Sequence, residues 1–105
     1  MRAGLTLSEL IPLTEAGAAW NGGAARILPA LRTGAATTDF AMGLMAKDLR
    51  IATEMGGRLG APLLMANAAR AMMQACANEE GAGANLDAIA QTVEKMAGLC
   101  FADHA

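Results

Sequence analysis

Apolar residues recur at spacings of three and four along most of this chain, which is the period of an amphipathic α-helix. The pattern predicts five helices, separated by short segments that contain glycine, asparagine or proline. The expected helices cover residues 6–17, 24–32, 39–58, 62–80 and 86–99. Four or five such helices packed on one another make an all-α fold, and we expect one compact bundle over residues 1–105.

Capping residues stand at several of the expected helix ends. Thr6 is followed three residues later by Glu9, which fits a capping box at the start of the first helix. Asn85 is expected to cap the last helix. Because Pro12 and Pro29 fall inside the first two helices, we expect these to be short or kinked. The expected caps of the third helix are Thr37, Thr38 and Asp39, and Asn21-Gly22-Gly23 is expected to form a turn before the second.

The third helix carries a lysine on an apolar stripe. The stripe has spacings of four, three and four, and its members are Phe40, Leu44, Lys47 and Ile51. In one explanation Lys47 snorkels: its aliphatic stem packs on neighbours while the ammonium group reaches water. In the other, Lys47 faces a bound anion or cofactor. The residues by themselves favour snorkelling.

Farther along, the third helix shows an ion-pair pattern and two adjacent glycines. Arg50, Glu54 and Arg58 are spaced four apart and are expected to form an exposed ladder. Gly56 and Gly57 either weaken the last turn or allow a close helix crossing.

Each of the last two helices has an apolar stripe that includes a cysteine. The stripe of the fourth helix consists of Met65, Ala69, Met72 and Cys76, and that of the fifth consists of Leu86, Ile89, Val93, Met96 and Cys100. Free cysteine on such a stripe is most simply a small buried hydrophobic residue.

The composition fits a helical domain. Of the 105 residues, 54% are hydrophobic but only 3% are aromatic, so leucine, isoleucine, methionine and alanine must supply the core. Three of these four are strong helix formers. The net charge of −2 gives no electrostatic reason to expect nucleic-acid binding. No apolar run has the length of a membrane span and the N-terminus lacks a signal-peptide pattern, so we expect a cytoplasmic protein with reduced thiols.

The segment 40–54 reads Phe-Ala-Met-Gly-Leu-Met-Ala-Lys-Asp-Leu-Arg-Ile-Ala-Thr-Glu. It resembles the C-terminal domain of the β-hydroxyacid dehydrogenases, which include 3-hydroxyisobutyrate dehydrogenase and the glyoxylate or succinic semialdehyde reductases. The family pattern there is Phe-x-x-x-Leu-x-x-Lys-Asp-Leu-x-x-Ala-x-Glu. Trp20, the segment Gly60-Ala61-Pro62-Leu63 and the glycine-rich turn 81–85 are also similar to landmarks of the family. These landmarks follow in order over essentially the whole chain.

The resemblance implies a cleft in which three residues of this segment take part. Lys47 would reach the cofactor or substrate side, Asp48 would support it, and Phe40 would line the same cleft. In the family, NAD(P) is bound by a Rossmann domain through a Gly-x-Gly-x-x-Gly loop, and the catalytic lysine lies in a Gly-x-x-x-Lys-x-x-Asn-type segment. These 105 residues contain neither. We therefore expect a truncated C-terminal domain that binds no cofactor and transfers no hydride on its own.

The resemblance also implies a partner. The helix that carries the family's catalytic lysine packs in the middle of this domain, so without it the apolar stripes would expose a large patch. We expect a homodimer or larger assembly that buries this patch, with dimerisation and closure of the substrate cleft as the role of the domain. A plain oligomeric binding or scaffold module is a further possibility.

A different hypothesis is a stand-alone hydrolase that acts on peptides or esters. Its thiol version would use Cys76 or Cys100 as the nucleophile and His104 as the base. Its metal version would bind zinc at a site completed between subunits. The candidate ligands are Glu79, Glu80, Asp103 and His104. The simpler interpretation of these residues is a solvated acidic end of the chain.

Overall fold

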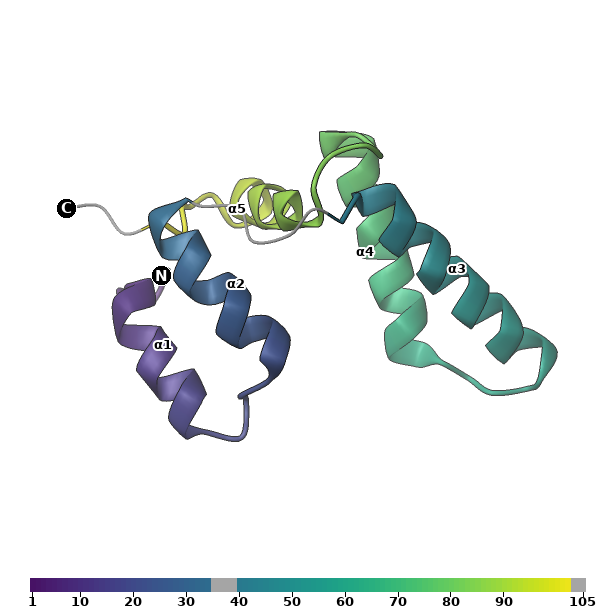
Figure 1. Cartoon of the computed structure of the whole chain (residues 1–105), viewed down its shortest axis with the longest axis horizontal. Coiled ribbons are helices and arrows are strands. Elements are labelled where there is room, and N and C mark those ends of the chain that lie inside the picture. Colours follow the sequence, from purple (N-terminus) through teal and green to yellow (C-terminus); the bar gives the residue numbers. More distant parts are fainter. Residues whose placement is uncertain (35–39, 103–105) are drawn as a thin grey trace. The chain divides into compact units, whose positions relative to one another are not determined.

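The computed structural model describes residues 1–34 and 40–102 of the chain. Its elements are α1 (Leu7–Ala16), α2 (Gly22–Thr33), α3 (Met42–Arg58), α4 (Leu64–Glu80), the 3₁₀ turn η1 (Leu86–Ala88) and α5 (Ile89–Ala97) (Figure 1). No strand occurs among these residues, which confirms the all-α prediction. The described residues divide into two compact units, which lie within Met1–Thr37 plus Val93–Ala105 and within Thr38–Thr92.

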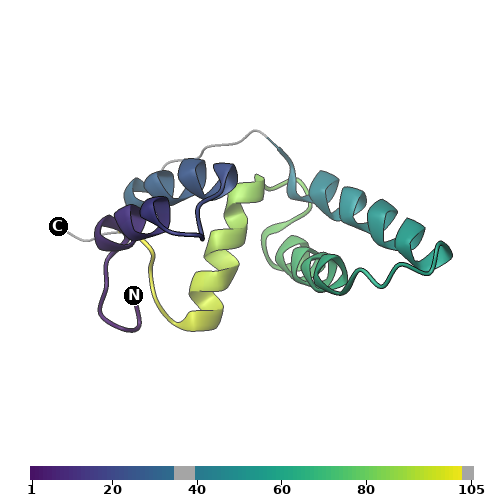
Figure 2. The same cartoon turned by 90° about the horizontal axis from the view of Figure 1, so that it is seen from below.

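In the first unit, α1 and α2 run side by side and are joined by a short loop (Figures 1 and 2). The predicted capping box begins α1: the Thr6 hydroxyl accepts from the Glu9 backbone N–H at 3.3 Å, and the Glu9 carboxylate accepts from the Thr6 N–H at 2.8 Å. Pro12 lies inside α1, which has ten residues and is short as predicted.

The segment expected to form a turn before α2 is instead the start of that helix. The Asn21 side-chain oxygen accepts from the Ala24 backbone N–H at 2.8 Å, so Asn21 is the N-cap and the helix begins at Gly22. The turn prediction was wrong because an asparagine before two glycines has the composition of a turn and also that of a capped helix start.

Hydrogen bonds also hold the end of the described chain in the first unit. Arg2 donates from its guanidinium group to the carbonyl of Ala97, the last residue of α5. The Glu94 carboxylate accepts from the Phe101 backbone N–H at 2.8 Å, and Phe101 is half-buried. The Glu94 side chain therefore ties Phe101 to α5.

In the second unit, α3 and α4 form a helical hairpin (Figure 1). Its core consists of Met42, Met73 and Cys76, and the partly buried residues around it include Met45, Leu49, Leu86 and Ile89. The face of α3 that is buried carries Met42, Leu49, Thr53 and Gly56. The predicted stripe lies on the other side of the helix, where Leu44 is 46% and Ile51 is 49% exposed.

Backbone carbonyls cap the start of α3. The Met42 and Gly43 N–H groups donate to the Ala84 and Ala82 carbonyls, both at 2.8 Å. The residues from which a side-chain cap was expected, 37–39, lie outside the described part of the chain. The helix begins at Met42, so Phe40 precedes it, and the Phe40 carbonyl accepts from the Leu86 N–H at 2.7 Å.

The stripe predicted on α4 is buried only in its second half. Cys76 is buried and Met72 is half-buried, whereas Met65 is 81% exposed and Ala69 is also exposed. The helix starts at Leu64, two residues later than expected. The final helix has the predicted cap, since Asn85 accepts from the Asp87 N–H at 3.2 Å, but its first turn is the 3₁₀ segment η1.

A search of the described residues found no helix that combines the length and the apolar character of a membrane span.

Candidate functional site

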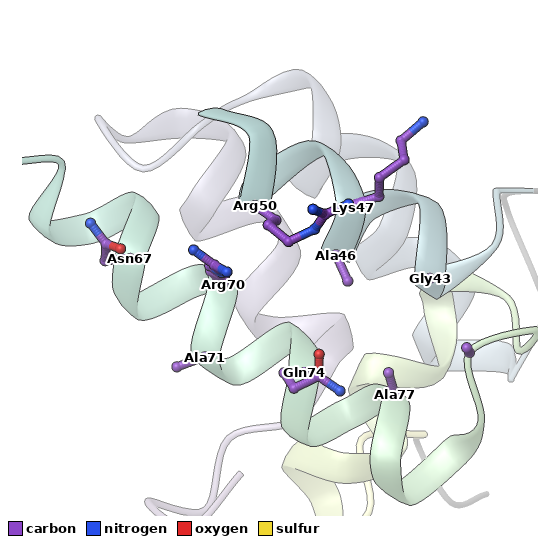
Figure 3. A pocket seen from close by; sticks show the side chains of 10 residues that line it. Gly43, Ala46, Lys47, Arg50, Asn67, Arg70, Ala71, Gln74 and Ala77 are labelled. Carbon is purple, nitrogen blue, oxygen red and sulfur yellow. The ribbon is translucent and has the colours of Figure 1, made fainter. Parts of the chain in front are cut away.

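A groove of about 670 Å³ lies between α3 and α4, within the second unit (Figure 3). Five of its lining residues have no side chain beyond Cβ, which leaves the space open. They are Gly43 and Ala46 of α3, Ala71 and Ala77 of α4, and Ala82. The other lining residues are polar or cationic: Lys47, Arg50, Asn67, Arg70 and Gln74. No carboxylate is among the residues that line this groove.

Gly43 lies close to the turn that follows α4. A Cβ added there would lie 3.0 Å from the Ala82 carbonyl oxygen and 3.3 Å from the Ala82 Cβ. The missing side chain thus allows the 81–84 turn to approach and cap α3.

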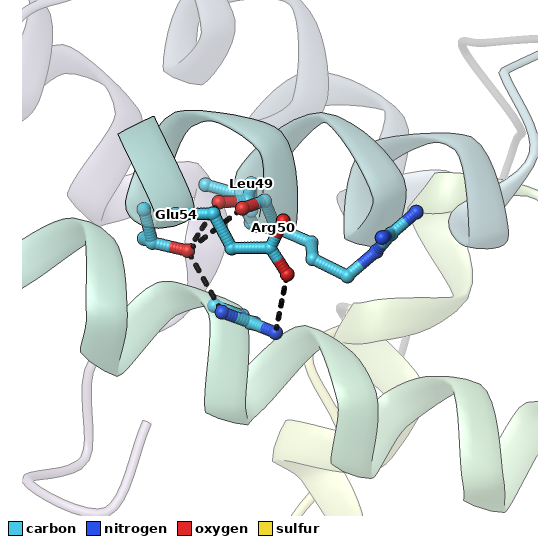
Figure 4. Close-up of polar contacts among 5 residues, drawn as sticks. Leu49, Arg50 and Glu54 are labelled. Atoms are coloured by element: carbon cyan, nitrogen blue, oxygen red, sulfur yellow. Dashed lines mark hydrogen bonds and ion pairs between the residues drawn. The ribbon is translucent and has the colours of Figure 1, made fainter. Parts of the chain in front are cut away.

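Arg70 makes two polar contacts with α3 (Figure 4). Its Nη1 donates to the Thr53 hydroxyl at 3.0 Å, and its Nη2 lies 3.9 Å from a carboxylate oxygen of Glu54. The Thr53 hydroxyl in turn donates to the Leu49 carbonyl at 2.8 Å. Glu54 therefore pairs across the hairpin, whereas the sequence predicted pairs along α3.

Arg50 differs from Arg70 in its surroundings. Among the described residues, no side chain or carbonyl accepts from its guanidinium group. Its donors remain available to a ligand, in contrast to the two that Arg70 directs at Thr53 and Glu54. Contacts with α3 thus fix the orientation of the Arg70 guanidinium, whereas the Arg50 guanidinium has no acceptor among the described residues.

Lys47 lines the groove with its stem and directs its ammonium group away from α4 (Figure 3). Nζ lies 3.7 Å from the Asp48 carboxylate, and the two side chains are 51% and 55% exposed. This is the geometry of a snorkelling side chain. Lys47 and Asp48 are therefore brought together, whereas Phe40, which the resemblance placed in the same cleft, is not among the residues lining this groove.

Reasoning from the sequence did not select Arg50, Asn67, Arg70 or Gln74 as site residues. A signal for them exists: Asn67, Arg70 and Gln74 are spaced three and four apart, so they form a polar stripe within the most hydrophobic region of the chain. A polar stripe on one flank of an apolar helix marks a surface that is not buried in the core.

The two cysteines have different environments. Cys76 is fully buried in the core of the second unit. Cys100 is exposed and follows the end of α5, so its placement on a buried stripe was wrong. The base that the thiol hypothesis required, His104, lies outside the described residues.

The acidic residues proposed as zinc ligands do not form a cluster with other potential ligands in the described chain. The Glu80 carboxylate accepts from the Thr92 hydroxyl at 3.4 Å. Within residues 1–34 and 40–102, no three His, Cys, Asp or Glu side chains are grouped closely enough to hold a metal ion. Glu79 and Glu80 are described, whereas Asp103 and His104 are not. No observation favours the hydrolytic hypothesis.

Comparison with known proteins gives one result. A protein-family model described as the NAD-binding domain of NADP-dependent 3-hydroxyisobutyrate dehydrogenase matches residues 1–93. The match includes α1 to α4, and with them the whole groove. Neither the curated proteins nor the solved structures contain a match.

Proposed function

Since the chain belongs to the family of NAD-binding domains of NADP-dependent 3-hydroxyisobutyrate dehydrogenases, we propose that it is the C-terminal, cleft-forming domain of such an oxidoreductase. The observation that carries the proposal is that Lys47, the lysine of the family pattern, is among the residues lining the groove between α3 and α4, with Asp48 beside it. In this proposal the domain also mediates homodimerisation, and the enzyme works in the cytoplasm.

The donor set of the groove suits an anionic cofactor or substrate. Its lining supplies cationic groups and side-chain amides and no carboxylate. Ammonium and guanidinium groups form charge-assisted hydrogen bonds with phosphate and carboxylate oxygens, which are stronger than neutral ones. When bound, the nicotinamide cofactor supplies or accepts the hydride. The residues of this chain bind and orient the anion, and Lys47 swings its flexible stem toward it.

Hydride transfer by these 105 residues alone is not part of the proposal. Such a reaction needs a nicotinamide bound in a fixed position and a group that moves a proton at the substrate oxygen. The sequence contains no Gly-x-Gly-x-x-Gly loop and no Gly-x-x-x-Lys-x-x-Asn segment. In this proposal the chain forms one wall of the cleft. A cofactor-binding domain forms the other wall.

The proposal is tested by following backbone amide signals of the chain in NMR spectra while NADP⁺ is added. The sequence by itself predicts no cofactor on this chain alone, but the cationic lining of the groove leads us to expect NADP⁺ binding. We expect saturable shifts near Lys47 and along the groove, and we expect Lys47→Ala to weaken them. Lys95→Ala is the matched control, because Lys95 is the other lysine of the chain, lies on α5 and is not among the residues that line the groove.

The same samples are incubated with 3-hydroxyisobutyrate and NADP⁺ to look for NADPH. We expect none. Turnover by the chain alone, or the absence of any saturable shift at the groove, would contradict the proposed function.

A further inference from the structure

We propose that Arg50 and Arg70 form a phosphoryl-binding subsite in the groove between α3 and α4. The inference deepens the proposed function, on which it rests for the use of this groove, by naming the chemical group that the groove binds. In this inference Arg50 and Arg70, rather than Lys47 and Asp48, contribute most to binding the phosphoryl group.

The groove has a positive local charge. The chain as a whole has a net charge of −2, yet the groove is lined by three cationic side chains and no carboxylate. Two carboxylates lie nearby, Asp48 beside Lys47 and Glu54 beside Arg70. The Arg50 guanidinium has no such neighbour among the described residues, so the surroundings remain positive and favour an anion.

The two arginines supply N–H donors whose number and geometry suit a phosphoryl group. A guanidinium group presents five N–H donors in a planar fork that matches the oxygens of a phosphoryl group. Arg70 uses one edge of its fork on Thr53 and Glu54, which fixes its orientation and leaves other N–H groups for a ligand. Fixing the side chain in advance lowers the entropy lost on binding.

The side-chain amides of Asn67 and Gln74 add further donors to the groove. Asn67 donates one of its two side-chain N–H groups to the Leu63 carbonyl at 2.8 Å, and Gln74 donates one to Asn78 at 2.9 Å. Each amide retains a second N–H. Two guanidinium groups and two amides supply more donors than a single carboxylate accepts, so the site favours a phosphoryl group with its several oxygens over a monocarboxylate.

The N-terminus of α3 does not compete for this role. The N–H groups of Met42 and Gly43 are taken by the carbonyls of Ala84 and Ala82. These two N–H groups are thus not available to an anion, and the side chains that line the groove are the donors to test by substitution.

The experiment is a titration of the chain with inorganic phosphate at constant ionic strength, followed by backbone amide shifts. We expect saturable shifts at Ala46, Asn67 and Ala71, and affinity about tenfold lower or worse in R50Q, because charge-assisted hydrogen bonds are lost. R58Q is the matched control: it removes the same group from an exposed position of α3 outside the groove. We expect it to bind phosphate like the unaltered chain.

Arg70 is tested by two variants, because its contacts with α3 give it a structural role as well. R70Q should lose affinity, and R70K, which keeps the charge but not the fork, should retain only part of it. Thermal unfolding of each variant is measured as a control, to establish that the variant is folded under the conditions of the titration. Acetate should bind less tightly than phosphate.

Two outcomes overturn the inference: equal phosphate affinity in R50Q and R58Q, or acetate binding as tight as that of phosphate. Either result leaves the proposed function standing if NADP⁺ still shifts the signals near Lys47. Conversely, phosphate binding without any effect of NADP⁺ would support the subsite and contradict the proposed function.

The source of the phosphoryl group is distinguished by comparing NADP⁺ with NAD⁺. A preference for NADP⁺ that R50Q removes supports the subsite and assigns it to the additional phosphate of that cofactor. Equal affinity for both nucleotides that R50Q lowers supports the subsite and assigns it to the diphosphate that the two cofactors share. Nucleotide binding that R50Q leaves unchanged, with phosphate binding that R50Q weakens, supports the subsite and assigns it to a free phosphate or a phosphorylated small molecule.

Discussion

Gly56 and Gly57 are neighbours in the last turns of α3, but only one of them faces another segment. A Cβ on Gly56 would lie 2.6 Å from Cδ1 and 2.9 Å from Cγ of Leu63, and 3.1 Å from the Ala61 carbonyl oxygen. A Cβ on Gly57 would have no heavy atom within 4 Å. Of the two roles that the sequence left open for this pair, close approach therefore applies to Gly56, where the approaching segment is the loop before α4.

We predict opposite effects of alanine at these two positions. Gly56→Ala should lower the free energy of unfolding by about 1–3 kcal/mol, since Leu63 and the backbone must shift. Gly57→Ala should raise it by about 0.5–1 kcal/mol, because alanine is the better helix former in open space. Urea unfolding followed by circular dichroism measures both. Equal destabilisation in the two variants would contradict the close approach.

The cysteines provide a second test at the scale of residues. Cys76 is fully buried and Cys100 is exposed, so a thiol reagent should modify Cys100 rapidly and Cys76 only after unfolding. The reaction is followed by mass spectrometry in the native chain and in urea. In the Cys100→Ser control the rapid phase should disappear. Rapid modification of both thiols in the unaltered chain would show that the core around Cys76 is open.

Lys47 should matter for binding much more than for stability. Its side chain is 51% exposed and contacts Asp48 at 3.7 Å, which is the geometry of a weak surface pair. Lys47→Ala should change the free energy of unfolding by no more than about 0.5 kcal/mol. A loss of several kcal/mol in urea unfolding would mean that Lys47 is a structural residue.

At the scale of elements, helix starts in this chain are capped in two ways. α1 and α2 are capped by side chains from the residue just before them, Thr6 and Asn21. α3 is capped by carbonyls of residues 82 and 84, about forty positions later in the sequence. Only a cap by a neighbouring side chain can be recognised from the sequence around the helix start. The start of α1 was therefore predicted, whereas the start of α3 was placed too early.

The local cap can be tested directly. Thr6→Ala removes the acceptor for the Glu9 N–H and should lower the free energy of unfolding by about 1 kcal/mol. Thr6→Ser keeps the hydroxyl and should restore most of this stability. Thermal and urea unfolding compare the two variants, and equal stability would show that the capping box does not stabilise the fold.

The faces of α3 show a second limit at this scale. Apolar residues occur on two sides of the helix, and the spacing of Leu44, Lys47 and Ile51 fits helical periodicity as well as that of Met42, Leu49 and Thr53. The packing partner selects between them: α4 covers the second set and leaves Leu44 and Ile51 about half exposed. Periodicity identified the helix but not its buried face.

At the scale of the whole molecule, the exposed apolar residues of α3 bear on assembly. Leu44, Ile51 and Met55 are each 46–49% exposed on one side of the helix. An apolar surface of this kind is common at protein interfaces. The homodimer expected from the resemblance therefore remains a prediction, and this surface is the place to test it.

We expect light scattering after size-exclusion chromatography to give the mass of a dimer or larger assembly. Ile51→Glu should shift the chain toward the monomer, because it places a charge within the apolar surface. Ala75→Glu adds the same charge at an exposed position of α4 and should not. A monomer in the unaltered chain would remove the prediction.

By itself, the sequence determined the helical class, the capping box of α1, the cap before η1 and membership of the dehydrogenase family. Each of these depends on residues close together in the chain or on a motif in fixed order. The tertiary structure alone decided which face of α3 is buried, that distant carbonyls cap this helix, and that Arg50 and Arg70 share a groove. These features arise from packing between segments far apart in sequence, for which local spacing contains no signal.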